Sequence, residues 1–181
     1  MARHAPARYP PDFDNVDIDV WTRVAPRTMT SPARVYALER AVEYVARNHV
    51  PGAIVECGVW RCGSMMAVAL TLLRLGVTDR ELYLLDTFEG MTEPGTDDVT
   101  PSGERASDIL ARSDSGSNVW AIASLDDVRH AVLGVGYPEE RIHFIKGPVE
   151  QTVPGSARIS GYTRGGCRPS EEPARTRAGS G

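Results

Sequence analysis

The feature of this sequence that most constrains its fold is the stretch from Gly52 to Ser64, GAIVECGVWRCGS. A short apolar run, Ala53–Val55, ends at the acid Glu56, and Gly58 follows two residues later. An apolar run that passes through a glycine turn into a helical pattern is typical of a buried parallel strand whose carboxyl end opens onto a ligand site. The stretch therefore predicts an α/β fold with a small-molecule site at this strand end.

The periodicity on either side of this stretch predicts alternating helices and strands. The predicted helices cover residues 32–48, 64–75, 106–111 and 125–133, the first opening at Ser31-Pro32 as N-cap and first helical residue. The predicted strands cover residues 53–57, 81–85 and 141–145. A strand–helix–strand order with a crossover of helix length implies parallel strands joined by right-handed connections.

Composition marks off three segments that lack this periodicity. Residues 1–19 are proline-rich and polar and residues 21–30 are irregular, so residues 1–30 are interpreted as an N-terminal arm or lid. Residues 92–117, rich in Gly, Pro, Asp, Ser and Thr, predict a long excursion that serves as a lid. Residues 155–181 have no apolar period, which predicts a disordered tail after a domain over residues 31–154.

Charge and hydropathy exclude several classes of protein. The net charge of −4 argues against a nucleic-acid partner, which normally requires a basic patch. No apolar run reaches the roughly 18 residues of a membrane span, and the first residues lack the apolar core of a secretory signal. Three cysteines without metal-finger spacing favour reduced thiols. We therefore expect a cytoplasmic protein without a membrane or nucleic-acid partner.

An acid stands at the carboxyl end of each of the first two predicted strands. Glu56 can meet a cationic ligand group, and Gly58 lets the backbone approach a ligand. In the alternative interpretation, Glu56 caps the next helix and Gly58 is an ordinary turn glycine. Asp86 stands where a carboxylate accepts hydrogen bonds from a ribose diol, or else it is a surface aspartate in a turn. Phe88 is either a partner of an adenine ring or a core residue, and Ser124 is an N-cap that can also bind an adenine edge.

The glycine spacing argues against two other nucleotide sites. Four residues separate Gly58 from Gly63, which differs from the dinucleotide pattern G-x-G-x-x-G. The turn also lacks the lysine of a phosphate-binding loop, so both NAD and ATP are disfavoured. Cys62, at the start of the next predicted helix, is either a thiol of lowered pKa or a small buried filler, and we favour the filler.

Five segments in order resemble the macrocin/mycinamicin-type sugar O-methyltransferases over about residues 12–154: Thr28–Ser31, Val55–Ser64, Asp86–Gly90, Ser124–Val128, and Lys146-Gly147 with Thr152–Pro154. The resemblance implies a Rossmann-like class I fold that uses S-adenosylmethionine, with the sheet order 3-2-1-4-5-7-6. It also implies methylation of a sugar hydroxyl on a macrolide-type secondary metabolite. The implied partner is a small glycosylated molecule, and intact relatives can form homo-oligomers.

The same resemblance assigns roles by position. The Gly58 turn would hold the amino-acid end of the methyl donor and Asp86 its ribose, while Met29 would close over it from the N-terminal segment. Phe88 and Glu89 would lie near the adenosine and Ser124 near the adenine. The implied set of cofactor-binding residues is Met29, Glu56, Gly58, Val59, Trp60, Gly63, Ser64, Asp86, Thr87, Phe88, Glu89, Gly90 and Ser124.

Two departures from the family pattern stand out. The family has glycine where this chain has Cys62, so a positive φ there would strain the turn and weaken cofactor binding. The family also continues past Pro154 into a strand ending in LRLD and a later aspartate pair, acids that bind Mg²⁺ and position the sugar hydroxyl. Because these acids are missing, we expect no catalytic residue or Mg²⁺ ligand in this chain.

The composition after Pro154 suggests a frameshift near codon 155 and a truncated product. The chain would then supply only strands 3, 2 and 1, leave the apolar first strand as an open edge, and transfer no methyl group. One alternative is a non-catalytic cofactor-binding fragment that acts with a full-length partner. The other, an NAD-type reductase, is disfavoured by the glycine spacing.

Overall fold

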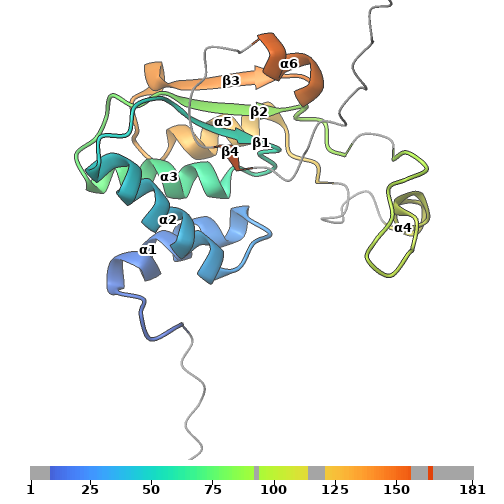
Figure 1. Ribbon diagram of the computed structural model, residues 1–181, viewed down its shortest axis with the longest axis horizontal. Coiled ribbons are helices and arrows are strands. Elements are labelled where there is room, and N and C mark those ends of the chain that lie inside the picture. The colour runs from blue at the N-terminus through green and yellow to red at the C-terminus, as the bar shows by residue number, and fades with distance from the viewer. Residues whose placement is uncertain (1–8, 92–93, 114–120, 156–162, 165–181) are drawn as a thin grey trace, which may run out of the picture.

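The computed structural model describes residues 9–91, 94–113, 121–155 and 163–164. Its centre is a parallel sheet with the order β3-β2-β1-β4 (Figure 1). The strands are β1 (Ile54–Cys57), β2 (Leu82–Asp86), β3 (Ile142–Lys146) and β4 (Thr163–Arg164). Leu82 pairs with Ile54 on one side and with Ile142 on the other. The predicted Rossmann-like order of the first three strands is confirmed.

The helices are α1 (Asn15–Val24), α2 (Pro32–Arg47), α3 (Gly63–Arg74), α4 (Ala106–Arg112), α5 (Leu125–Leu133) and α6 (Val149–Gly155), with short 3-10 turns η1 (Ala25–Arg27) and η3 (Glu139–Arg141). Helices α3 and α5 lie along the sheet, and α1 and α2 both pack against α3, whereas α4 lies away from the sheet (Figure 1). The predicted helices and strands match these bounds within one or two residues. Of the predicted lid over residues 92–117, residues 92–93 and 114–117 lie outside the described residues.

The core forms where α3 lies between the sheet and α2. Helix α3 is apolar nearly all round, and Met65 and Leu72 are fully buried. A helix of this kind is stable only when it is covered on several sides, here by α1, α2 and α5. Leu82 and Leu84 of β2 join the same core. The stretch that follows the glycine turn is therefore the most enclosed helix of the described molecule.

The N-terminal segment is more ordered than predicted. The expectation of an irregular segment over residues 21–30 is wrong, because α1 runs to Val24 and η1 continues to Arg27. A capping box opens α1: the Asp14 carboxylate accepts from the amide of Asp17 at 2.9 Å, and the Asp17 carboxylate accepts from the amide of Asp14 at 3.0 Å. Val20 and Val24 of α1 pack into the hydrophobic core, which holds the helix against the rest of the domain. The assignment of residues 1–30 as a separate lid stays a prediction.

The sheet does not end at β1, which corrects a second expectation. Thr163 and Arg164 of β4 pair in parallel with Val55 and Glu56, in the position that the implied order gives to a fourth strand. Strand β1 is therefore covered at these two residues instead of forming an open edge. Helix α6 over residues 149–155 was also not predicted. Residues 156–162 and 165–181 lie outside the described residues, so the predicted disorder is untested there.

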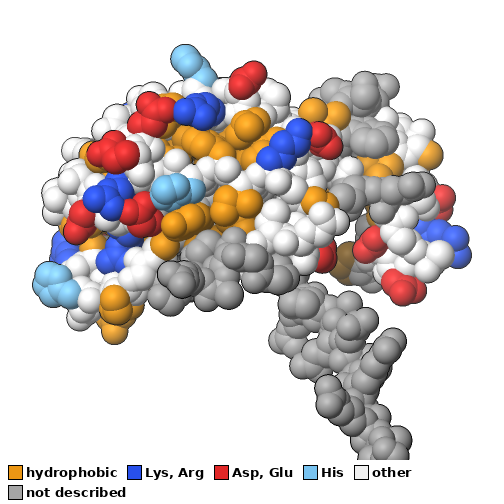
Figure 2. Space-filling model, turned by 90° about the horizontal axis from the view of Figure 1, so that it is seen from above, with side chains coloured by type: hydrophobic (Ala, Val, Ile, Leu, Met, Phe, Trp, Pro, Cys, Tyr) orange, Lys and Arg blue, Asp and Glu red, His pale blue; other side chains and the backbone are white. Residues whose placement is uncertain are grey.

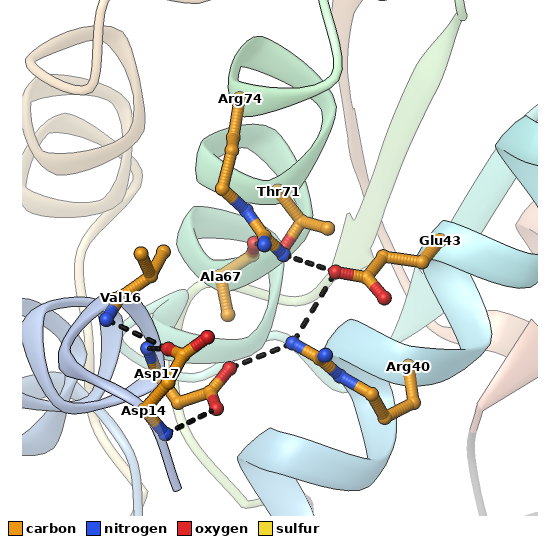
Figure 3. A network of polar contacts seen from close by, with 8 residues as sticks. All are labelled: Asp14, Val16, Asp17, Arg40, Glu43, Ala67, Thr71 and Arg74. Atoms are coloured by element: carbon orange, nitrogen blue, oxygen red, sulfur yellow. Dashed lines mark hydrogen bonds and ion pairs between the residues drawn. The ribbon is translucent and has the colours of Figure 1, made fainter.

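A polar network joins the three helices outside the sheet (Figure 3). Arg40 of α2 contacts the buried carboxylate of Asp17 of α1 at 2.6 Å and that of Glu43 at 3.2 Å. Arg74 of α3 also pairs with Glu43. Glu39 is buried beside this network, and burial, followed by the charge of Asp17, raises the pKa of Glu39 to about 7. The negative charge of Glu39, next to this network, is therefore only partly balanced by the nearby arginines.

The surface seen in Figure 2 carries hydrophobic side chains between positive and negative ones, so neither sign of charge dominates that face. Across the described ranges, no helix combines the length and the apolar character that a membrane crossing requires.

Candidate functional site

The carboxyl ends of β1 and β2 lie side by side, as the sequence predicts. Cys57 pairs with Leu85, and the amide of Gly58 donates to the carbonyl of Leu85 at 2.9 Å. The glycine turn after β1 therefore lies next to the segment Asp86–Gly90 that follows β2. The carboxyl ends of parallel strands are where open α/β sheets bind ligands.

The carboxylate of Asp86 accepts hydrogen bonds from both of these loops. Its Oδ2 atom accepts from the amides of Val59 at 2.6 Å and Trp60 at 3.0 Å. Its Oδ1 atom accepts from the amide of Phe88 at 2.8 Å, and the Thr87 hydroxyl lies 3.4 Å away. A carboxylate has about four acceptor positions, so nearly all of this one is engaged by the protein itself. Sequence reasoning missed this structural role, since it assigned Asp86 to a ribose.

The glycine turn contains strained residues. Trp60 has φ 47° and Cys62 has φ 70°, the left-handed region that favours glycine. A positive φ at Cys62, the condition under which the sequence predicts strain in this turn, is thus present. The side chain of Cys62 is fully buried, and this burial, followed by the charge of Glu56, raises the pKa of its thiol. Cys62 is therefore a buried filler and not an activated thiol.

Gly63 brings the N-terminal segment against the start of α3. A Cβ atom at this position would lie 2.6 Å from the carbonyl oxygen of Arg27 and 2.7 Å from Cβ of Thr28. No side chain fits in that space, so only glycine permits this approach. The second glycine of the turn is therefore required by the contact with residues 27 and 28, in addition to its place at the helix start.

An ion pair holds the same segment to α5. The guanidinium of Arg27 donates to both carboxylate oxygens of Asp127, each at 2.9 Å. This pairing raises the pKa of Arg27 and lowers the pKa of Asp127. Arg61 adds a hydrogen bond to the carbonyl of Pro26 at 3.2 Å. Residues 26–28 are thus fixed to the glycine turn and to α5 together.

A cavity of about 430 Å³ lies between this segment and the glycine turn. It brings together seven of the residues predicted for the cofactor: Met29, Glu56, Gly58, Val59, Trp60, Gly63 and Ser64. It is also lined by five residues that the prediction did not include: Arg27, Thr28, Thr30, Arg34 and Cys57. The resemblance at Thr28–Ser31 was the available signal for the N-terminal members of this set.

The other six predicted residues do not line this cavity. Phe88 is buried in the core, which is the alternative that the sequence left open. Glu89 is exposed and pairs with Lys146 at 2.7 Å. Ser124 caps α5 by accepting from the amide of Asp127 at 3.2 Å. The remaining three, Asp86, Thr87 and Gly90, belong to the loop after β2, where the Thr87 hydroxyl donates to the Gly90 carbonyl at 3.1 Å.

The strand order and the site together define a Rossmann-like α/β protein with a cavity at the carboxyl end of β1, where open α/β sheets bind ligands. The family model for macrocin-O-methyltransferase (TylF) matches residues 11–160. The chain therefore belongs to this family of O-methyltransferase enzymes.

Individual relatives agree with this assignment. The chain is 35% identical over 136 residues to 8-demethyl-8-(2,3-dimethoxy-alpha-L-rhamnosyl)-tetracenomycin-C 4'-O-methyltransferase of Streptomyces olivaceus. The aligned region covers 75% of this chain and 49% of that protein. It is 28% identical over 127 residues to mycinamicin III 3''-O-methyltransferase of Micromonospora griseorubida, and the aligned region covers 70% of this chain and 48% of that protein. The solved structure of the O-methyltransferase NovP is similar with a TM-score of 0.59 and 31% identity, covering 74% of this chain and 52% of NovP. The chain thus spans about half the length of these relatives.

Proposed function

We propose that this chain binds S-adenosylmethionine in the cavity beside Gly58, as the donor-binding part of an enzyme that methylates a sugar hydroxyl of a macrolide-type secondary metabolite. The observation that carries the proposal is the cavity itself. It joins the glycine turn after β1 to Met29 of the N-terminal segment, in a chain of the macrocin-O-methyltransferase family.

The residues around the cavity suit this ligand. Gly58 has φ 77°, and a Cβ atom built there would have nothing within 4 Å, so its backbone faces open space that a ligand can enter. Glu56, buried at the end of β1, gives the cavity an acid that can face the α-ammonium group of the donor. Val59, Trp60, Gly63 and Ser64 would surround the same amino-acid end.

The loop after β2 would hold the nucleoside. We assign the ribose to the region of Asp86, with Thr87, Phe88, Glu89 and Gly90 around the adenosine and Ser124 near the adenine. Support comes from the bonds between Asp86 and the glycine turn, which fix this loop against the cavity wall. Since Asp86 already accepts three backbone amides, a ribose would share this carboxylate with the protein.

The bound donor would supply a methyl group on a sulfonium centre, which a hydroxyl oxygen attacks directly. The residues of this chain would orient that donor, which is the contribution of a positioning site. In the described ranges, no group of three or more His, Cys, Asp or Glu side chains is placed to hold a metal ion. The described residues therefore offer no set of ligands that fits Mg²⁺.

Calorimetric titration with S-adenosylhomocysteine tests donor binding. We expect saturable binding at one site per chain and no comparable binding of NADH. Binding of NADH in place of S-adenosylhomocysteine would contradict the proposal, as would binding of neither ligand by folded protein.

A second assay addresses transfer. A macrolide that carries a deoxysugar is incubated with the chain, S-adenosylmethionine and Mg²⁺, and the product is followed by mass spectrometry. We predict no methylation by this chain alone, because we assign the described residues that line the cavity to the donor and none of them to the sugar hydroxyl. Turnover would refute the predicted inactivity while leaving the donor site in place.

A further inference from the structure

The cavity presents opposite charges from different elements. Glu56 contributes a carboxylate from the end of β1, and Arg34 contributes a guanidinium from the first turn of α2. The other arginine of the lining, Arg27, is already engaged by both oxygens of Asp127. Arg34 is exposed and forms no ion pair with any of the residues that the structure describes. It is therefore the cation of this lining whose guanidinium is available to a ligand.

The start of α3 adds to the positive side of the cavity. Helix α3 has 12 residues, and its N-cap, Cys62, makes no side-chain hydrogen bond to the first turn. Gly63 and Ser64, the first two residues of the helix, line the cavity. The opening amides of a helix and its dipole favour an anion. Arg34 and this helix end therefore favour the same kind of group.

We propose that Arg34 binds the α-carboxylate of the methyl donor, together with the opening amides of α3. This inference rests on the proposed function, since it concerns the same cavity. An α-amino acid carries a carboxylate and an ammonium on one carbon, so a site for its end needs both signs of charge within a few ångströms. Arg34 supplies the positive side and Glu56 the negative side. Arg34 thereby becomes a specificity-determining residue, which selects donors that retain the carboxylate.

Two ligands and matched variants test this role. Calorimetry compares S-adenosylhomocysteine with its decarboxylated analogue, which lacks only the α-carboxylate. R34Q removes the charge, R34K retains it, and R47Q is the control, because Arg47 is also exposed and lies at the other end of α2, outside the cavity lining. Thermal unfolding of each variant establishes that it is folded.

We expect R34Q to bind S-adenosylhomocysteine about tenfold more weakly, as the loss of a charge-assisted hydrogen bond at a partly exposed site implies. Its affinity for the decarboxylated analogue should be unchanged, R34K should recover part of the loss, and R47Q should match the unmodified chain. An equal loss for both ligands, or no loss for either, would overturn the role of Arg34 and leave donor binding intact. Failure of the unmodified chain to bind S-adenosylhomocysteine would instead defeat the proposed function and this inference together.

Discussion

Gly63 and Arg27 touch so closely that a methyl group on Gly63 would lie 2.6 Å from the carbonyl oxygen of Arg27. Real Cβ atoms do not approach backbone oxygens this closely, so one of the two segments would have to move. The contact joins the start of α3 to the wall of the proposed donor cavity. A substitution at Gly63 should therefore change both the free energy of unfolding and the affinity for the donor.

We predict that Gly63→Ala lowers the free energy of unfolding by about 1–3 kcal/mol and weakens binding of S-adenosylhomocysteine. Urea denaturation measures the first effect and calorimetry the second. Gly95→Ala is the control, because a Cβ at Gly95 meets only Asp98 Oδ2 at 3.7 Å. A Gly63→Ala chain as stable as the Gly95→Ala chain would show that the contact does not constrain the fold.

Cys62 allows a test of backbone strain. Its φ of 70° disfavours any residue with a Cβ by about 1 kcal/mol, while its buried thiol contributes packing. Both Cys62→Ala and Cys62→Gly lose the sulfur, but only glycine relieves the strain. We therefore expect the glycine variant to have the higher urea midpoint, which is also the order that these two residues follow at an N-cap position. An alanine variant that is the more stable of the two would rule out the strain.

The raised pKa of Glu39 leads us to expect that the stability of the fold depends on pH. Its pKa is raised to about 7 in the folded chain from an ordinary value of 4.5, so folding favours the protonated acid. The groups around it are Asp17 of α1, Arg40 and Glu43 of α2, and Arg74 of α3. The free energy of unfolding should fall as pH rises from about 4.5 to 7, by on the order of 3 kcal/mol at most.

Glu39→Gln removes this titration, so its stability relative to the unmodified chain should rise between pH 5 and pH 8. Urea denaturation at both pH values gives the difference. Glu140→Gln, at an exposed acid, should show no such change. A stability difference for Glu39→Gln that is the same at both pH values would mean that Glu39 is not the titrating group.

A substitution at Asp86 distinguishes a structural role of this carboxylate from a role in binding the ligand. Asp86→Asn places an amide donor among the donating amides of Val59, Trp60 and Phe88, so we predict a loss of about 1–3 kcal/mol in the free energy of unfolding. Asp98→Asn is the control, because Asp98 is exposed and accepts one amide, from Gly95 at 2.8 Å. An unchanged urea midpoint with a large loss of affinity for S-adenosylhomocysteine would mean that Asp86 serves the ribose alone.

The sequence was sufficient where the signal was local. The apolar runs before Glu56 and Asp86 predicted β1 and β2, and the parallel order then placed the two strand ends side by side. The capping box Asp14–Asp17 was also readable, but the few apolar residues of α1 concealed the helix. Helix α6 and the two-residue strand β4 carry too little periodicity to be found in this way.

The parts of the site that escaped prediction depend on contacts between distant segments. The need for glycine at residue 63 comes from Arg27, and the engagement of the Asp86 carboxylate comes from the turn after β1. Arg34 was missed because the interpretation of the N-terminal motif stopped at Ser31, three residues before the cavity lining resumes. No spacing rule within one segment reveals such approaches.

The pair between Arg27 and Asp127 has a consequence for the order of folding. The two residues are 100 positions apart in the chain, and closing a flexible loop of that length costs about 4 kcal/mol. A partly exposed ion pair returns only about 1 kcal/mol, so it cannot form before the sheet and α3 have brought its ends together. Residues 26–30 should therefore dock late in folding and open first in the native state. The amides of residues 27–30 should exchange with deuterium sooner than those of α3, and a bound donor should slow that exchange.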